Sequence, residues 1–208
     1  MSDKFDITKL YPQLYTAEPR QPVLVQVPAL RILAIGGEGD PKGAVFQQSV
    51  EALYRLAYGI KFMPKHGVVP EDFVDFKVPP LEALWSMRDG KPFDSEKPEQ
   101  WQWEAFVVVP GFVTQALVKK AAADMGERHP NPKYELAHIK TLEEKQAVHI
   151  LHIGSYKAEM SDIVLMRSYM ESHELKPSAA HHEIYLSNPQ KVATSRPKTI
   201  LRQPVIKK

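Results

Sequence analysis

One order of predicted elements occurs twice in this chain, and that order constrains the fold more than any other feature. Short apolar runs that end at glycine or proline predict strands, and apolar side chains recurring every three or four residues predict helices. Proline and glycine mark most of the boundaries between them. The first set comprises a strand at 30–35, a helix at 42–63 and strands at 81–87 and 103–109, and the second comprises a strand at 147–156, a helix at 157–173 and strands at 181–187 and 199–206.

This order predicts an α+β fold built from two strand–helix–strand–strand modules related by pseudo-twofold symmetry, with helices packed on an antiparallel sheet. We expect residues 1–22 to be a lead-in to a single domain over 23–208. Repeat one covers about 30–109, a helical insertion about 111–145, and repeat two about 147–206. A duplication of this kind creates a central cleft between its halves, which is a natural place for a ligand.

The composition restricts the chemistry that the protein can perform. The 208 residues include no cysteine, which excludes disulfides, thiolate metal sites and a cysteine nucleophile. Lysine and arginine number 27 against 25 aspartates and glutamates, and a net charge of +2 argues against direct nucleic-acid binding. Apolar runs are far shorter than the roughly 20 residues of a membrane span. We expect a cytoplasmic protein without a membrane segment, monomeric or homodimeric.

The strand predicted at 181–187 carries the strongest candidate for a functional site. On a strand, His181, Glu183 and Tyr185 share one face, opposite the apolar residues of the same segment. One interpretation is the solvated outer face of a half-exposed sheet. The other is the floor of a cleft, where Glu183 binds a cation or activates a water molecule and Tyr185 stacks or donates a hydrogen bond.

The first repeat offers a partial counterpart, because Glu82 is followed closely by Trp85. If the two repeats are related by a pseudo-twofold axis, Glu82 and Glu183 would lie near each other. Burial and like-charge repulsion would then raise the pKa of one of them, an arrangement typical of acid–base pairs. The alternative for Glu82 is an ordinary exposed glutamate on a strand.

Several familiar kinds of site are not predicted. His181 and His182 are adjacent on a strand, so their imidazoles point to opposite faces and cannot chelate one ion, and we expect no metal. Gly36–Gly39 precedes a helix but lacks the Gly-Lys-Ser/Thr ending of a phosphate loop, which favours a simple turn. We expect no cofactor.

Aromatic residues are concentrated on the elements beside the expected cleft, among them Trp85, Trp103, Tyr54 and Tyr156. Many such side chains serve only as core. A pocket lined by aromatic rings and one or two carboxylates would suit flat, hydrophobic and often cationic molecules.

An ordered set of motifs resembles the GyrI-like small-molecule-binding family, whose members are stand-alone relatives of the effector-binding domains of AraC-type and multidrug-sensing regulators. The resemblance covers nearly the whole chain from about residue 22. It rests on Leu-Glu-Ala-Leu-Trp at 81–85, Leu-His-Ile-Gly-Ser-Tyr at 151–156, His-His-Glu-Ile-Tyr-Leu-Ser-Asn-Pro at 181–189 and Thr-Ile-Leu-Arg-Gln-Pro-Val at 199–205.

The resemblance implies a cleft that binds hydrophobic, aromatic or cationic xenobiotics, with Glu183 as its glutamate. It implies Tyr185 and Tyr156 as neighbours of Glu183, with Glu82 and Trp85 supplied by the first repeat. The aromatic residues Trp103 and Tyr54 complete the expected ligand-binding set. Some relatives hydrolyse the cyclopropane ring of cyclopropanoid DNA-alkylating compounds, so an enzyme is the alternative. Its catalytic residues would be Glu183, Glu82 and Tyr156. A protein partner at an exposed sheet edge is a third possibility, whereas no histidine is well placed as a haem ligand.

Overall fold

The computed structural model describes residues 4–90, 97–155, 158–187 and 197–208. It divides into two compact units. The first unit consists of Met1–Leu10, Leu30–Pro79 and Ser86–Leu142, and the second consists of Tyr11–Ala29, Pro80–Trp85 and Glu143–Lys208. Every strand pairing with a described register is antiparallel, and helices accompany the strands in both units. The fold class is therefore α+β, as predicted.

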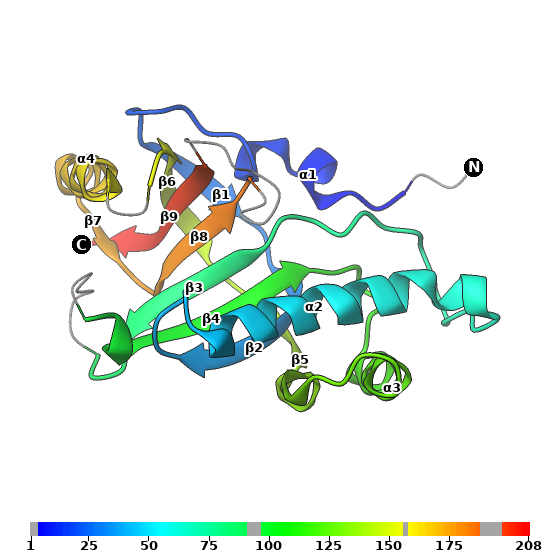
Figure 1. Ribbon diagram of the computed structural model, residues 1–208. Coiled ribbons are helices and arrows are strands. Elements are labelled where there is room, and N and C mark those ends of the chain that lie inside the picture. The colour runs from blue at the N-terminus through cyan, green and yellow to red at the C-terminus, as the bar shows by residue number, and fades with distance from the viewer. Residues whose placement is uncertain (1–3, 91–96, 156–157, 188–196) are drawn as a thin grey trace. The chain divides into compact units, whose positions relative to one another are not determined.

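The elements of the first unit are α1 (Ile7–Leu10), β2 (Leu30–Glu38), α2 (Ala44–Phe62), β4 (Trp101–Val108), α3 (Gln115–Gly126) and β5 (His138–Leu142), with short 3-10 helices η2 (Met63–His66), η3 (Pro98–Gln100) and η4 (Pro132–Leu136). Its strands are ordered β4-β2-β5. The long helix α2 contacts β2 and β4 and lies beside α3 (Figure 1). This arrangement buries one side of α2 against the strands and α3.

The sequence of α2 explains its burial. Gly43 occupies the N-cap position with an extended backbone, so the helix begins just after the Pro41 that was expected to start it. The buried residues of α2 recur at helical spacing and are Ser49, Ala52, Leu53, Leu56, Ala57 and Ile60.

None of the described helices is long and apolar enough to cross a membrane.

Strand β2 continues through two glycines that were expected to end it. Gly37 pairs with Trp103 of β4, and the indole ring lies directly over the Gly37 backbone. A Cβ atom at Gly37 would lie 2.4 Å from two atoms of that ring, whereas one at Gly36 would meet nothing nearer than 3.8 Å. The edge of Phe46 packs against the same indole at 4.9 Å between ring centroids. Gly37 is therefore needed for the close approach of the tryptophan, not for a turn.

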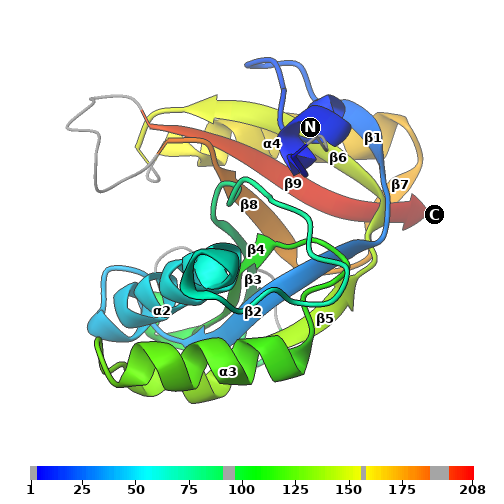
Figure 2. The same ribbon diagram turned by 90° about the vertical axis from the view of Figure 1, so that its right-hand side faces the viewer.

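The elements of the second unit are η1 (Pro12–Leu14), β1 (Val23–Val27), β3 (Glu82–Met87, of which Glu82–Trp85 belong here), β6 (Lys145–Ile153), α4 (Met160–Ser172), β7 (Leu175–Pro177), β8 (His181–Tyr185) and β9 (Lys198–Lys207). The strand order is β1-β6-β9-β8-β3, and β7 pairs with β9. Figure 2 shows α4 lying against one face of these strands. The core beneath α4 is apolar and contains Val148, Ile150, Met166, Met170, Leu175, Leu201 and Val205.

The two faces of this sheet have different coverings. We call the face that carries Val148 and Leu201 the α4 face, because these side chains pack against α4. The opposite face carries Arg202, and we call it the Arg202 face. There the segment around η1 lies close, since Arg202 Nη2 donates a hydrogen bond of 2.6 Å to the carbonyl oxygen of Leu14. Both faces are thus covered by parts of the same unit.

The predicted order of elements is confirmed: β2-α2-β3-β4 and β6-α4-β8-β9 follow each other as expected, with α3 and β5 between them. Strands β1 and the three-residue β7 were missed, and β5 lies within the segment expected to be a helical insertion. Residues 73–78, which precede β3, form only an isolated bridge, between Phe5 and Phe76. Pro79 and Pro80 follow at once, and proline cannot donate to a strand ladder.

Replacing Gly37 with alanine should destabilise the protein by roughly 1–3 kcal/mol, because the new methyl group and the Trp103 indole cannot occupy the same space. Urea unfolding followed by circular dichroism measures this change. Gly36→Ala is the matched control in the same strand and should be near neutral or slightly stabilising. Equal stabilities of the two variants would contradict the proposed role of Gly37.

Candidate functional site

The register between β3 and β8 places the two candidate glutamates on opposite faces of the sheet. Ala83 lies opposite Glu183, and Glu82 lies opposite Ile184. Paired residues in an antiparallel sheet point to the same side. The Glu183 side chain is therefore on the α4 face and the Glu82 side chain on the Arg202 face. The expected acid–base pair of Glu82 and Glu183 is not formed.

The α4 face carries a group of polar and aromatic side chains around Glu183. Glu183 accepts a hydrogen bond from the Tyr185 hydroxyl. The indole Nε1 of Trp85 in turn donates to the hydroxyl oxygen of Tyr185 at 3.1 Å. His181 Nε2 lies 4.0 Å from Glu183 Oε1. Glu183 and Trp85 are only 8% and 4% exposed, so this group is largely shielded from water.

The start of α4 is fixed over the same face. Tyr185 of β8 lies opposite Thr199 of β9, and Thr199 lies opposite His152 of β6, so the three side chains form a row. His152 Nδ1 lies 2.7 Å from Asp162 Oδ2 in the first turn of α4. Glu159, the N-cap residue of that helix, is 8% exposed. A second buried carboxyl group is thereby held on the α4 face, as Glu183 is.

Burial changes the proton affinity of this group. Burial, reinforced by the charges of Glu183 and Asp162, raises the pKa of Glu159 to about 9. Burial also raises the pKa of Glu183 to about 7, although the hydrogen bond from Tyr185 opposes the change. Burial lowers the pKa of His181 to about 4, so this imidazole is neutral at pH 7 and supplies no positive charge to Glu183.

A chain of buried polar groups crosses the Arg202 face. Tyr15 donates a hydrogen bond of 2.9 Å to Glu82 Oε1, and the other oxygen of Glu82 lies 2.9 Å from His182 Nε2. His182 Nδ1 lies 2.8 Å from Glu144 Oε1. Glu144 Oε2 is 3.5 Å from Arg202 Nη1. Two carboxylates thus alternate with two cations at positions that are almost completely buried.

The electrostatics of this chain are balanced internally. Burial would lower the pKa of His182, but Glu144 and Glu82 outweigh it and raise the pKa above its usual value. Burial would raise the pKa of Glu144, but His182 and Arg202 hold it below the usual range. Both ring nitrogens of His182 face carboxyl oxygens, an arrangement that favours the doubly protonated imidazolium. Nearby His149 is neutral at pH 7, because burial and Arg202 lower its pKa to about 4.

The structure brings together three of the predicted site residues, namely Glu183, Tyr185 and Trp85. Glu82 lies on the other face, where its hydrogen bonds to Tyr15 and His182 give it a structural role. Tyr156 lies outside the described residues, as does the Asn188–Pro189 end of its motif.

Tyr54 and Trp103 belong to the first unit. The Trp103 indole is 2% exposed and covers Gly37. Tyr54 stacks with Tyr58 on α2 at 6.5 Å between ring centroids. The participation of Tyr54 and Trp103 in ligand binding stays a prediction.

Sequence reasoning missed several residues of both groups. Glu144, Glu159, Asp162 and His152 were not singled out as candidates. Arg202 offered the one usable signal, because an arginine within the apolar strand that ends the chain must find a buried partner. No comparable signal marks Glu159, whose burial depends on where α4 begins.

His181 and His182 point to opposite faces, as expected for adjacent strand residues. Among the residues that the structure describes, no group of three or more histidine, aspartate or glutamate side chains could hold a metal ion. The chemistry that these two faces support is therefore that of carboxyl groups, imidazoles and phenols.

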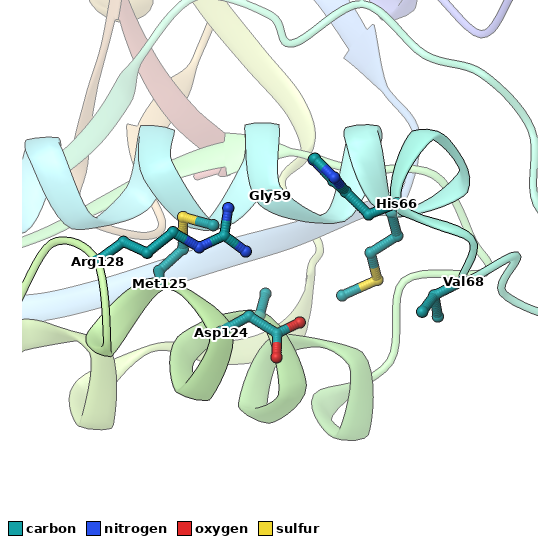
Figure 3. A pocket seen from close by; sticks show the side chains of 8 residues that line it. Gly59, His66, Val68, Asp124, Met125 and Arg128 are labelled. Atoms are coloured by element: carbon teal, nitrogen blue, oxygen red, sulfur yellow. The ribbon is translucent and has the colours of Figure 1, made fainter.

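A separate small pocket lies in the first unit between α2 and α3 (Figure 3). Asp124 of α3, Arg128 just after α3 and His66 of η2 provide its polar lining, and Gly59 lines it on the α2 side. Its volume of about 40 Å³ is close to that of one water molecule. It is far too small for a drug-sized ligand, which needs roughly 300 Å³ or more.

Comparison with known proteins adds to this geometry. The sequence profile of the GyrI-like small molecule binding domain matches residues 20–205. A hydrolase from Listeria innocua is 32% identical, with a TM-score of 0.90 over 98% of this chain and 100% of its own. An uncharacterized conserved protein from Listeria innocua is also 32% identical, with a TM-score of 0.89 over the same shares.

A more distant structure shares the fold alone. The C-terminal domain of EcmrR is 11% identical, with a TM-score of 0.56 over 90% of this chain and 98% of its own. A search of functionally curated proteins gives no match.

Replacing His182 with leucine should destabilise the protein by about 3–5 kcal/mol, because Glu82 and Glu144 would lose the cation that lies between them. Tyr15→Phe removes only one hydrogen bond to Glu82 and should cost about 1 kcal/mol. Urea unfolding of both variants at pH 7 measures the difference. If both variants lose the same free energy of unfolding, the His182 side chain contributes no more to stability than the single hydrogen bond of Tyr15.

Replacing Glu159 with glutamine should stabilise the protein at alkaline pH. An acid whose pKa is raised by folding stays protonated in the folded state, so stability falls as the pH rises from about 4.5 towards 9. The variant removes this penalty, which at about 1.4 kcal/mol per pH unit above 4.5 is on the order of 5 kcal/mol at pH 8 and absent at pH 4. Unfolding experiments at both pH values, with the exposed Glu171→Gln as control, measure it. A difference in unfolding free energy that does not change with pH would contradict a buried Glu159 carboxyl group with a raised pKa.

Proposed function

The chain belongs to the GyrI-like small-molecule binding domain family, and from this premise we propose that it binds hydrophobic, aromatic cations through Glu183. The observation that carries the proposal is a buried carboxyl group next to aromatic side chains. No lysine or arginine within the described residues forms an ion pair with Glu183, and its neighbour His181 is neutral at pH 7. A ligand cation would supply the missing charge.

The neighbouring aromatic side chains support the same class of ligand. Trp85 and Tyr185 are linked by a hydrogen bond and lie with Glu183 on the α4 face. Aromatic rings attract cations by about 0.5–2 kcal/mol each, and flat ligands can also stack on them. A carboxylate in such a setting orients the positive end of a ligand, while the rings bury the rest of it.

Replacing Glu183 with glutamine should weaken binding of ethidium, a planar and permanently charged cation, by about tenfold or more, because a charge-assisted contact of roughly 1.4 kcal/mol or more is lost. Fluorescence titration at pH 8 measures the affinity. The exposed Glu143→Gln removes the same charge from the same unit and should bind like the wild type. Nile red, a neutral planar dye, should be affected little. Unchanged ethidium affinity in Glu183→Gln would refute the role of this carboxyl group.

Hydrolysis of a cyclopropanoid alkylating compound is the second candidate function. Two observations favour it: the pKa of Glu183 lies at about 7, where a general base works well, and a similar structure is a hydrolase. In this reaction Glu183 takes a proton from water while the water oxygen bonds to a ring carbon. A ring C–C bond breaks, its electron pair moves to the conjugated carbonyl oxygen, and that oxygen is protonated. Tyr156, or Tyr185 once its hydroxyl turns away from Glu183, is proposed to donate a hydrogen bond to it.

Incubation of the protein with a cyclopropanoid alkylator should convert the compound to its water adduct faster than buffer does, and Glu183→Ala should lose this acceleration. Mass spectrometry of the small molecule measures the adduct. Glu143→Gln again serves as the control variant. Formation of the adduct at the same rate with wild type, Glu183→Ala and buffer would leave binding as the function.

A further inference from the structure

Glu159 is a buried carboxyl group that does not cap the helix it precedes. It stands at the N-cap of α4, yet its side chain makes no capping hydrogen bond. Only 8% of the residue is exposed, and its Oε1 atom is buried without a hydrogen-bond partner. Leaving a buried acceptor unsatisfied is unfavourable, because the water that it bonded in the unfolded chain is not replaced. A group retained at such a cost is a candidate for contact with a ligand.

The surrounding contacts hold Glu159 in place. Its carbonyl oxygen accepts hydrogen bonds from the amides of Asp162 and Ile163, at 2.9 and 3.0 Å, in the first turn of α4. Asp162 is fixed in turn by His152, whose other ring nitrogen lies 3.1 Å from the carbonyl oxygen of Ser155. These bonds join α4 to β6 and to the loop between them. The position of Glu159 over the sheet is therefore set by strand β6.

We propose that Glu159 is a specificity-determining residue of the Glu183 site: a ligand cation held by Glu183 also meets the Glu159 carboxyl group, which gives up its proton as the cation binds. The inference rests on the proposed binding function and adds a second carboxyl group to it. The titratable groups that face Glu159 are Glu183 on β8 and Asp162 on α4, with His152 on β6 bonded to Asp162. Sites of this kind prefer cations over neutral ligands of the same shape.

A proton balance follows from this arrangement. In the free protein, burial and the neighbouring carboxylates raise the pKa of Glu159 to about 9, so the group is mostly protonated at pH 8. Glu183, with a pKa of about 7, is mostly ionised at that pH. A permanent cation stabilises the ionised form of both groups. Binding at pH 8 should therefore release a proton that comes mainly from Glu159.

Isothermal titration of ethidium at pH 8, in phosphate and in Tris, tests this, because the two buffers differ in ionisation enthalpy and the difference in heat gives the number of protons released. We expect the wild type to release up to about one proton per ligand. Glu159→Gln should release far less and bind several-fold more weakly. Glu171→Gln, which removes an exposed carboxyl group of the same helix, should match the wild type in both respects.

The outcomes separate the inference from the function on which it rests. Wild-type binding without proton release, or equal release by Glu159→Gln, would overturn the inference while the binding function stands. A wild type that does not bind ethidium would overturn the proposed function and the inference with it. Glu159→Gln is expected to fold, since an amide resembles the neutral acid that the folded protein already contains, and circular dichroism checks this.

Discussion

The buried imidazolium of His182 is the interaction on which the second unit depends. Its two ring nitrogens lie 2.9 Å from Glu82 and 2.8 Å from Glu144, and all three side chains are almost completely buried. Removing these ions from water is tolerable only because each has a partner of opposite charge. The partners come from β3, β8 and the residue before β6, so the charge balance also fixes the positions of those strands.

The buried ionisable side chains on one face of the sheet form ion pairs within the fold, whereas the buried carboxyl groups on the other face form none with lysine or arginine among the described residues. On the Arg202 face, two carboxylates meet two cations within the fold. On the α4 face, Glu183 and Glu159 have raised pKa values and no lysine or arginine ion pair among the described residues. His182 and Glu183 are neighbours in sequence, yet strand alternation places them in these opposite environments. Buried carboxyl groups without cations are unfavourable for folding alone, which is the physical reason to assign them to a ligand.

The sequence predicted the order of elements well, because periods of two and of three to four residues are local properties. It also predicted that His181, Glu183 and Tyr185 share a face. The pairing of Glu82 with Glu183 could not be decided, since the face of one strand relative to another depends on register, which is set by tertiary contacts. Glu159 was missed for a similar reason: its burial follows from a bond between His152 and Asp162 that no local pattern reveals.

The two proposed functions, binding and hydrolysis, use one carboxyl group, and on these proposals the charge of the small molecule decides between them. A permanent cation holds Glu183 in its ionised form, and a carboxylate neutralised in this way is a weak base towards water. A neutral compound with a strained ring leaves Glu183 free to take a proton from water. On the same proposal, Glu159 is a neutral acid in the free protein and keeps its proton when a neutral compound binds, so it can donate a hydrogen bond. A bound cation would instead displace that proton. The proposals thus assign two roles to the same two carboxyl groups: retaining cations, and activating water against neutral electrophiles.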